Sequence, residues 1–508
     1  MSSSGSTEIA RQSVAAAKWG LVSSVAKFAM QLLVNIAIAR LLGPDAYGLF
    51  ALATIALLVA TFLSEVGLGW SLMQRPALDD TVIRFVFTWQ CLSGLAGLAF
   101  MVAGGQLMGD FLRDPRVAEV MRWLGLCCLF NGMAATATNL MRREMRFRDL
   151  ARIQLSSYAL AYGLIGLPLA ALGGGVWALV AAWVAQSLLG LIQSCRARPH
   201  PWRPRLGIER PREFFDVGAT VLLTNLCNWA LTNVDRLILG RLAGTQAAGH
   251  YAVGYNLATV PNGLLISALQ PAFLASGARL QDDLPRLAKG YLEVQSFIWI
   301  VLAPLFGLLA LVGPELIRLL YGSTWADSEP VFVWLALAMP AYLAWALSTP
   351  VLWNTGRKRW EVLLQLPLLA AAVPALLWAA GQGAACVAAG AALLFVLRFL
   401  LMAGSAWRAL PLAAGSLQGL LLRTAGVGAA VLLPGWLLGA WLGPVIGPFW
   451  LLGALKAVAC LLPWLLLLLV WPRLLGRPAL NLLQRFMPKG SALGRAWAAR
   501  IAPDTPEV

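Results

Sequence analysis

The stretch ARLLGPDAYGLFALA, residues 39–53, returns later in the same chain as GRLAGTQAAGHYAVG, residues 240–254. When the two stretches are aligned, Arg40 pairs with Arg241, an offset of 201 residues. Both copies then fit the pattern R-L-x-G-x-x-A-x-G-x-[F/Y]-A. The arginines and glycines of this motif are Arg40, Gly43 and Gly48 in the first copy and Arg241, Gly244 and Gly249 in the second. Chance agreement is the alternative in a chain so rich in alanine and glycine.

The composition around these copies is that of an integral membrane protein. Of the 508 residues, 59% are hydrophobic and only 12% are charged, which is too apolar for a soluble chain of this length. Apolar runs of about 20 residues, enough to cross a hydrocarbon core of about 30 Å, recur along the sequence. Runs of this length suit helices rather than the shorter alternating strands of a barrel. We therefore predict an all-α polytopic membrane protein.

We predict about fourteen membrane-spanning helices. Their approximate bounds are residues 16–38, 46–66, 81–104, 119–140, 152–171, 174–194, 213–239, 249–271, 291–312, 330–353, 362–380, 383–404, 424–443 and 447–471. One copy of the motif lies between the first and second spans, and the other lies between the seventh and eighth. Because an even number of spans separates the copies, the two halves have the same orientation, a plan known in secondary transporters that enclose a central site between their halves.

This repeat predicts two pseudo-symmetric six-helix lobes followed by two further helices. The longest basic, proline-rich connection falls between the lobes and suits an interlobe linker. The predicted domains are the N-terminal lobe 1–194, the cytoplasmic linker 195–212, the C-terminal lobe 213–404, two additional transmembrane helices in 405–471 and a basic cytoplasmic tail 472–508.

The net charge of +16 is explained by membrane topology rather than by nucleic-acid binding. The basic residues fall in alternate loops, and a cytoplasmic N-terminus places 142–152, 196–212, 357–359 and the tail after Trp471 inside, together roughly thirty of the 39 Lys and Arg. An even number of spans returns the C-terminus to the cytoplasm. The first span is too long and too polar for a cleaved signal peptide. The seven cysteines show no CxxC or His pairing, so neither a metal site nor a disulfide framework is indicated.

Four stretches in this order and spacing resemble the Wzx-like flippases of lipopolysaccharide and exopolysaccharide export, which share the MATE-like fold of the multidrug/oligosaccharidyl-lipid/polysaccharide exporter superfamily. The stretches are ARLLGPDAYGLFALA, TNVDRLILGRLAGTQAAGHYAVGYNLATVP (232–261), GPELIRLLYGSTWADSEPVFVWLA (313–336) and NTGRKRWE (354–361). The resemblance covers residues 14–405. It implies movement of an undecaprenyl-pyrophosphate-linked glycan from the inner to the outer leaflet of the bacterial inner membrane by alternating access, and partners among the polysaccharide polymerase and export machinery.

The first predicted span carries polar residues at helical spacing. Lys27, Gln31 and Asn35 recur every four residues and lie along one face. An ionisable residue inside the bilayer costs about 3 kcal/mol on insertion scales and usually faces a bundle interior or a wet cavity. We interpret Lys27 as a cation for a pyrophosphate or an acidic sugar, with the two amides bonding glycan hydroxyls. The alternative is polar contact between helices, with Lys27 paired or snorkelling.

The seventh predicted span mirrors this pattern in the second lobe with Asn225, Asn228, Asp235 and Arg236. The substrate-binding candidates there are the two asparagines and the arginine. Asp235 either binds a coupling proton or sodium ion or locks the lobe interface. Glu65, near the cytoplasmic end of the second span, is a candidate to pair with Lys27 or to gate the inner mouth, and the alternative is a solvated helix end. The arginines of 142–152 are expected to contact anionic membrane lipid.

Two rival functions remain. A membrane-embedded glycan polymerase would need acids, bases or metal ligands in a large loop, and the loops here are short, so we expect no enzyme, no cofactor and no metal. A cation-coupled multidrug exporter of the same fold benefits from buried acids, whereas two of the three deep charges here, Lys27 and Arg236, are cationic. A peptidoglycan-precursor flippase stays open because its cargo shares the polyprenyl diphosphate.

Overall fold

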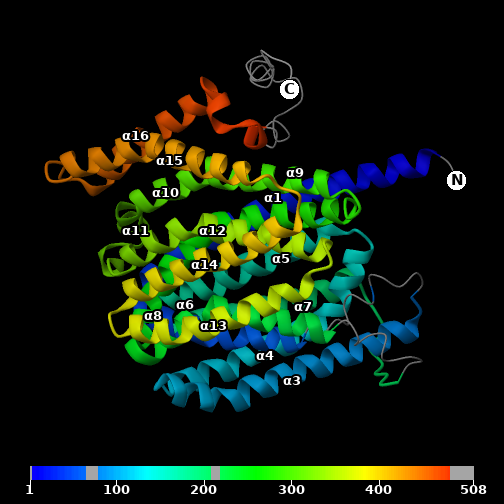
Figure 1. The fold of residues 1–508 in the computed structure, drawn as a ribbon. Coiled ribbons are helices and arrows are strands. Elements are labelled where there is room, and N and C mark those ends of the chain that lie inside the picture. The colour runs from blue at the N-terminus through cyan, green and yellow to red at the C-terminus, as the bar shows by residue number, and fades with distance from the viewer. Residues whose placement is uncertain (1–2, 65–71, 73–77, 208–217, 481–508) are drawn as a thin grey trace. The chain divides into compact units, whose positions relative to one another are not determined.

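The structure, a computed structural model, describes residues 3–64, 72, 78–207 and 218–480. These residues form helices and their connections, with no strand among them (Figure 1). They divide into two compact units, one of Met1–Val253 with Leu377–Ala384 and one of Gly254–Leu376 with Ala385–Val508.

The first unit is built mainly from the N-terminal helices. They are α1 (Ser3–Ser64), α3 (Asp80–Leu112), α4 (Arg116–Arg143), α5 (Phe147–Ala161), the π-helical turn Tyr162–Gly166, α6 (Leu167–Ala171) and α7 (Val176–Ala197). The long helix α8 (Gly218–Ala278) begins in this unit and continues into the second. Helices α3 and α4 pack along their lengths, as Figure 1 shows, and α4 also packs against α1 and α7.

The second unit contains the remaining helices. They are α9 (Leu284–Ser296), the π-helical turn Phe297–Leu302, α10 (Ala303–Leu311), α11 (Gly313–Tyr321), the 3-10 turn Ser323–Trp325, α12 (Ser328–Asn354), α13 (Lys358–Ala380), α14 (Ala384–Ala409), α15 (Ala414–Leu442), α16 (Phe449–Leu469) and the 3-10 turn Pro472–Leu475. Helices α15 and α16 form a hairpin (Figure 1), with α15 against α10 and α16 against α11.

Eleven helices among the described residues are long and apolar enough to cross a membrane. The expected number of about fourteen is therefore not confirmed. The difference arises at the two copies of the motif. Helix α1, expected as two spans, counts once over Ala26–Thr61, and α8, expected as the seventh and eighth spans, is not among the eleven.

Helices α1 and α8 are both interrupted at the repeated glycine of the motif. Gly43 has φ 76° and ψ 175°, and Gly244 has φ 82° and ψ −179°, whereas the residues on either side are helical. Glycine adopts positive φ without the steric cost of a side chain. The 62 residues of α1 would extend about 93 Å as a straight helix, about three times the thickness of a membrane core, so this break is needed for the helix to fit a bilayer.

The second repeated glycine serves a close approach of the two helices. A Cβ atom on Gly48 would overlap the carbonyl oxygen of Thr245 and the nitrogen of Gly249, and a Cβ on Gly249 would overlap the carbonyl oxygen of Pro44. Pro44 and Thr245 are related by the same 201-residue offset as the two glycines, so each copy of the motif makes the same contact on the other. We call this contact, made by Pro44, Gly48, Thr245 and Gly249, the glycine crossing.

The connection after α7 packs against α3 rather than standing away from it. The ring of His200 lies 4.8 Å from that of Phe87, the ring of Trp202 lies 5.4 Å from Phe87, and Thr88 accepts a hydrogen bond from the backbone N–H of Arg205 at 2.8 Å. Burial lowers the pKa of His200, which favours the neutral form of its ring. The part of the predicted linker beyond Gly207 lies outside the described residues.

The glycine crossing predicts that a single methyl group at either glycine is not tolerated. Gly48→Ala or Gly249→Ala forces the two backbones apart, and overpacking of this kind typically costs about 1–3 kcal/mol or more. We expect a lower melting temperature of the purified protein for both variants. Gly104→Ala on α3 is the matched control, because a Cβ there meets nothing within 4 Å. Equal melting temperatures for all three variants would contradict the crossing.

Candidate functional site

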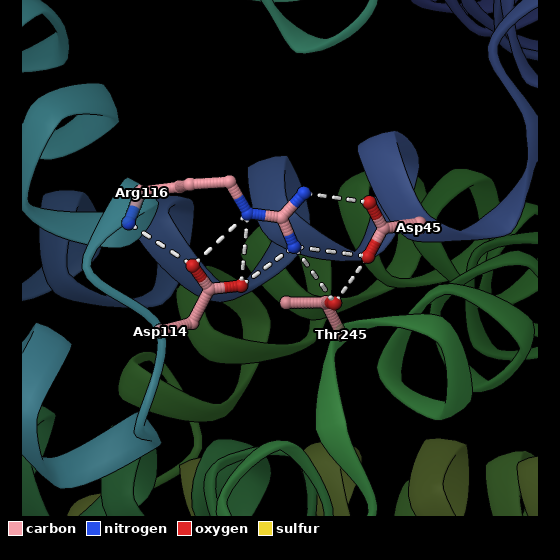
Figure 2. Close-up of polar contacts among 4 residues, drawn as sticks. All are labelled: Asp45, Asp114, Arg116 and Thr245. Atoms are coloured by element: carbon pink, nitrogen blue, oxygen red, sulfur yellow. Dashed lines mark hydrogen bonds and ion pairs between the residues drawn. The ribbon is translucent and has the colours of Figure 1, made fainter.

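Three loops that the topology predicts on one side of the membrane meet beside the glycine crossing (Figure 2). Arg116 begins α4, Asp45 follows the break in α1, and Thr245 follows the break in α8. Asp114, two residues before Arg116, completes the group. We call Asp45, Asp114, Arg116 and Thr245 the Arg116 cluster.

The guanidinium of Arg116 binds two carboxylates at once (Figure 2). Its Nη1 lies 2.8 Å from Oδ2 of Asp45 and its Nη2 lies 3.1 Å from Oδ1 of the same carboxylate, a bidentate pair. Nε and Nη2 also donate to Asp114, the shortest of these bonds being 2.7 Å. The Thr245 hydroxyl donates to Asp45, and Arg116 Nη2 lies 3.4 Å from that hydroxyl. One arginine thus joins the two copies of the repeated motif to the start of α4.

The Arg116 cluster is accessible to solvent. The side chains of Arg116 and Asp45 are 52% and 51% exposed, and that of Asp114 is 15% exposed. Exposed ion pairs contribute about 0–1 kcal/mol each, and bidentate networks lie at the upper end. Contacts of this strength hold the four side chains of the cluster together and can still break and re-form.

The arginines of the motif take unequal positions. Arg241 donates a hydrogen bond to the carbonyl of Phe111, at the end of α3, and its guanidinium lies 4.9 Å from the centre of the Phe111 ring. Arg40 is exposed. The second copy is therefore attached to the α3–α4 connection at two points, through Arg241 and through Thr245.

The polar residues predicted along the first span lie on α1 and are half-buried. Among the residues that the structure describes, Lys27, Gln31 and Asn35 make no hydrogen bond or ion pair with one another or with α8. Their assignment to a substrate site stays a prediction.

The candidates on α8 are arranged around its break. Asp235 is 2% exposed and accepts a hydrogen bond from the hydroxyl of Tyr251, which lies beyond Gly244 in the same helix. This bond ties the two halves of α8 together and gives Asp235 a structural role beside any role in ion coupling. Arg236 and Asn228 are half-buried, and Arg236 Nη2 lies 3.4 Å from the carbonyl of Thr232.

Two predicted residues lie where nothing is described of their side chains. Glu65 is outside the described residues altogether, and the side chain of Asn225 is likewise not described. Both remain predictions from the sequence. In the part of the chain that is described, no group of three or more His, Cys, Asp or Glu side chains could hold a metal ion.

The second unit contains charged groups to which the sequence assigned no role. Arg398 of α14 is fully buried, with Nη2 2.6 Å from Oε1 of Gln365 and its guanidinium 3.5 Å from the centre of the Trp345 ring. Lys456 of α16 lies 2.6 Å from Glu315 of α11, and the two side chains are 12% and 11% exposed. The Lys456–Glu315 pair fastens the C-terminal hairpin to the rest of its unit.

This pair predicts a large loss of stability when one partner is removed. Leaving one buried charge unpaired typically costs about 3–5 kcal/mol, whereas replacing both charges by apolar side chains is near neutral. Lys456→Met or Glu315→Leu should lower the melting temperature strongly, and the double variant should recover most of the loss. Arg318→Met is the control, because Arg318 pairs with Glu329 at 2.6 Å while 50% exposed. Additive losses in the double variant would refute the internal pair.

Sequence comparison identifies the family. A model of the family described as polysaccharide biosynthesis protein matches residues 37–330, more than half of the chain. The chain belongs to this family. The match begins shortly before the first copy of the repeated motif and includes the Arg116 cluster and both breaks, so the features described above lie in the family's own region.

Curated relatives carry names from polysaccharide biosynthesis and transport. The lipopolysaccharide biosynthesis protein WzxC of Escherichia coli (strain K12) is 23% identical over 334 residues, 63% of this chain and 65% of that protein. The succinoglycan biosynthesis transport protein ExoT of Rhizobium meliloti (strain 1021) is 24% identical over 67% of this chain and 68% of its own length. The matched region thus spans just under two thirds of WzxC. The chain is a multi-pass membrane protein of the polysaccharide biosynthesis family.

Solved structures show the same fold. The lipid II flippase MurJ in an inward closed conformation aligns with a TM-score of 0.71 over 90% of this chain and 99% of its own, at 12% identity. An inward-facing MATE family multidrug resistance transporter of the MOP superfamily aligns at 0.58 over 80% of this chain and 98% of its own, at 13% identity. The predicted all-helical, MATE-like membrane fold is confirmed. The named activities among these proteins are transport and flipping rather than enzymatic catalysis, as predicted.

Proposed function

We propose that the chain moves a polyprenyl-diphosphate-linked oligosaccharide from the inner to the outer leaflet of the bacterial inner membrane, for export of a polysaccharide. The observation that carries this proposal is the fold of a flippase in a chain of the polysaccharide biosynthesis family. The family name supports a glycan cargo. The half-buried cation Lys27 on α1 supports an anionic group on that cargo, such as a diphosphate.

The topology that goes with this function has fourteen spans, with α1 and α8 each crossing the membrane twice. The breaks at Gly43 and Gly244 support it, because each divides a helix too long for one crossing. Both termini are then cytoplasmic, as the positions of the basic residues favour. The repeat also supports the predicted six-helix lobes, 1–194 and 213–404.

In this topology the Arg116 cluster lies on the outer side of the membrane and closes the outer end of the transport path. Alternating access requires the two copies of the motif to part there when the cargo leaves. The contacts of Arg116 join both copies, and their half-exposed setting makes them weak enough to break and re-form. The cluster is thus an outer latch, and the glycine crossing beside it sets how closely the two copies fit.

The membrane potential can drive the movement. One negative charge that crosses the whole field outward gains about 2.3 kcal/mol per 100 mV, and a diphosphate bearing roughly two charges gains about twice that. An obligatory proton or sodium ion is then unnecessary, although Asp235 remains the candidate if one is used. Flipping that ignores an imposed potential and follows a pH or sodium gradient would reject this source of energy.

Deletion of the gene in its source organism tests the cargo. We expect polyprenyl-linked oligosaccharide to accumulate in the cell and exported polysaccharide to fall at least tenfold, and the wild-type gene to restore both. Lys27→Glu should fail to restore export at matched protein level, because it replaces the cation by an anion that repels a diphosphate. Lys289→Glu on α9, an exposed position, is the matched control and should restore export fully.

The opposite result of the deletion experiment would identify the rival function. If the exported polysaccharide is unchanged and the cells become sensitive to cationic dyes, the chain is a multidrug exporter. Lys27 is then a packing residue rather than part of a substrate site.

Cross-linking tests the outer latch. In a cysteine-free form of the protein, Asp45→Cys and Thr245→Cys joined by a short bifunctional thiol reagent should stop export, since the two copies can no longer separate. A reducible reagent should allow recovery on reduction. The control is Glu144→Cys with Arg198→Cys, which replaces an ion pair of 2.6 Å between the predicted N-terminal lobe and the start of the predicted linker, both in the first unit, and should leave export unchanged. Full export by the linked Asp45–Thr245 pair would refute the latch.

A further inference from the structure

A cavity of about 380 Å³ opens beside the Arg116 cluster in the first unit. Its walls come from the turn after Gly43 in α1, the first turns of α4 and the connection between α6 and α7. This volume falls in the range of small-molecule sites, about 300–1,000 Å³. All three walls belong to loops and helix ends predicted on the outer side of the membrane.

The cavity combines groups that recognise hydroxyls with one aromatic side chain. Asp45 and Glu119 supply carboxylate oxygens, and Arg116 supplies donors. The connection Gly173–Gly175 carries no side chains, so its backbone N–H and C=O groups form the wall directly. Trp177, in the first turn of α7, is 36% exposed and also lies in the wall.

The balance of charge in this cavity narrows the class of ligand. Two carboxylates, Asp45 and Glu119, face one guanidinium, which is itself shared with Asp114, so the wall is acidic overall and disfavours anions such as a diphosphate. The same net charge attracts an organic cation, but a cation without hydroxyls leaves the donors of Arg116 unused. A neutral ligand with many hydroxyls avoids the penalty on anions and bonds to both the carboxylates and the guanidinium. It finds acceptors in the carboxylates, donors in Arg116, and an apolar ring face on Trp177.

We propose that this cavity binds sugar residues of the exported glycan on the outer side of the membrane. The placement of this cavity on the outer side of the membrane rests on the proposed function and topology. The class of ligand rests on the chemical groups that line the cavity. The cavity shares Asp45 and Arg116 with the outer latch, so a bound sugar hydroxyl competes with the ion pair that holds the latch. Glycan arriving at the outer face therefore acts on the same side chains that close it.

Binding to the purified full-length protein tests the proposal. The probes are short neutral oligosaccharides released by mild acid from the polysaccharide that the source organism exports, with tetraphenylphosphonium and inorganic pyrophosphate as cationic and anionic comparisons. Saturation-transfer difference NMR reports binding of each. We expect the oligosaccharides to bind, Trp177→Ala and Glu119→Gln each to weaken binding roughly tenfold, and Trp177→Phe to retain most of it. Trp123→Ala is the matched control, an exposed tryptophan of α4 outside the cavity.

Three results overturn the proposal. These are absence of oligosaccharide binding to the wild-type protein, equal binding by wild type and Trp177→Ala, and Trp177-dependent binding of tetraphenylphosphonium alone. The export assay separates this failure from a failure of the proposed function. If wild type restores export in the deletion strain and the oligosaccharides do not bind, only the glycan cavity is wrong. If deletion leaves lipid-linked oligosaccharide and export unchanged, the flippase itself is wrong, whatever the purified protein binds.

Discussion

The contact between Gly48 and Gly249 is the constraint on which the candidate site depends. Two long helices, distant in sequence, approach until a single methyl group would overlap the opposite backbone. The breaks at Gly43 and Gly244 sit one helical turn before this contact and direct each helix into it. The repeated motif thus contains two glycines with different purposes, one for its backbone conformation and one for its small size. This explains why the same short pattern appears twice in one chain.

The residues around the glycine crossing supply the contacts on which the proposed outer latch rests. Arg116 spans both copies of the motif through Asp45 and Thr245, and the cavity with Trp177 opens next to it. Transport by alternating access needs a place where two halves meet closely and separate reversibly. The proposed outer latch takes its close fit from the backbone crossing and its reversibility from half-exposed charged contacts of modest strength.

Much of this architecture could be predicted from the sequence, because the length and composition of an apolar run are enough to identify a membrane helix. The repeat could be recognised because both copies have glycine at the helix break and at the close approach. The number of spans was not confirmed, because α8, expected as two spans, is not among the eleven apolar helices of the described residues. The candidate residues along α1 and α8 remain untested by the structure.

The Arg116 cluster could not be read from the sequence in the same way. Its members are separated by up to 200 residues, and only the fold brings Asp45 and Thr245 together. One signal was present, since Arg116 is a basic residue in a loop predicted on the side poor in basic residues. Arg398 and the pairing of Lys456 with Glu315 were missed because helices in lipid are apolar on every face, so periodicity does not reveal which face is buried.

The most direct test of the flippase is translocation by the purified protein in vesicles. A polyprenyl-diphosphate-linked oligosaccharide isolated from the deletion strain is incorporated into the bilayer, and the fraction reachable by an externally added glycosidase is followed with time. The account predicts that vesicles with wild-type protein expose nearly all of the lipid, faster when the potential favours outward movement of negative charge. Protein-free vesicles should expose about half. Equal accessible fractions with and without the protein, at either potential, would contradict it.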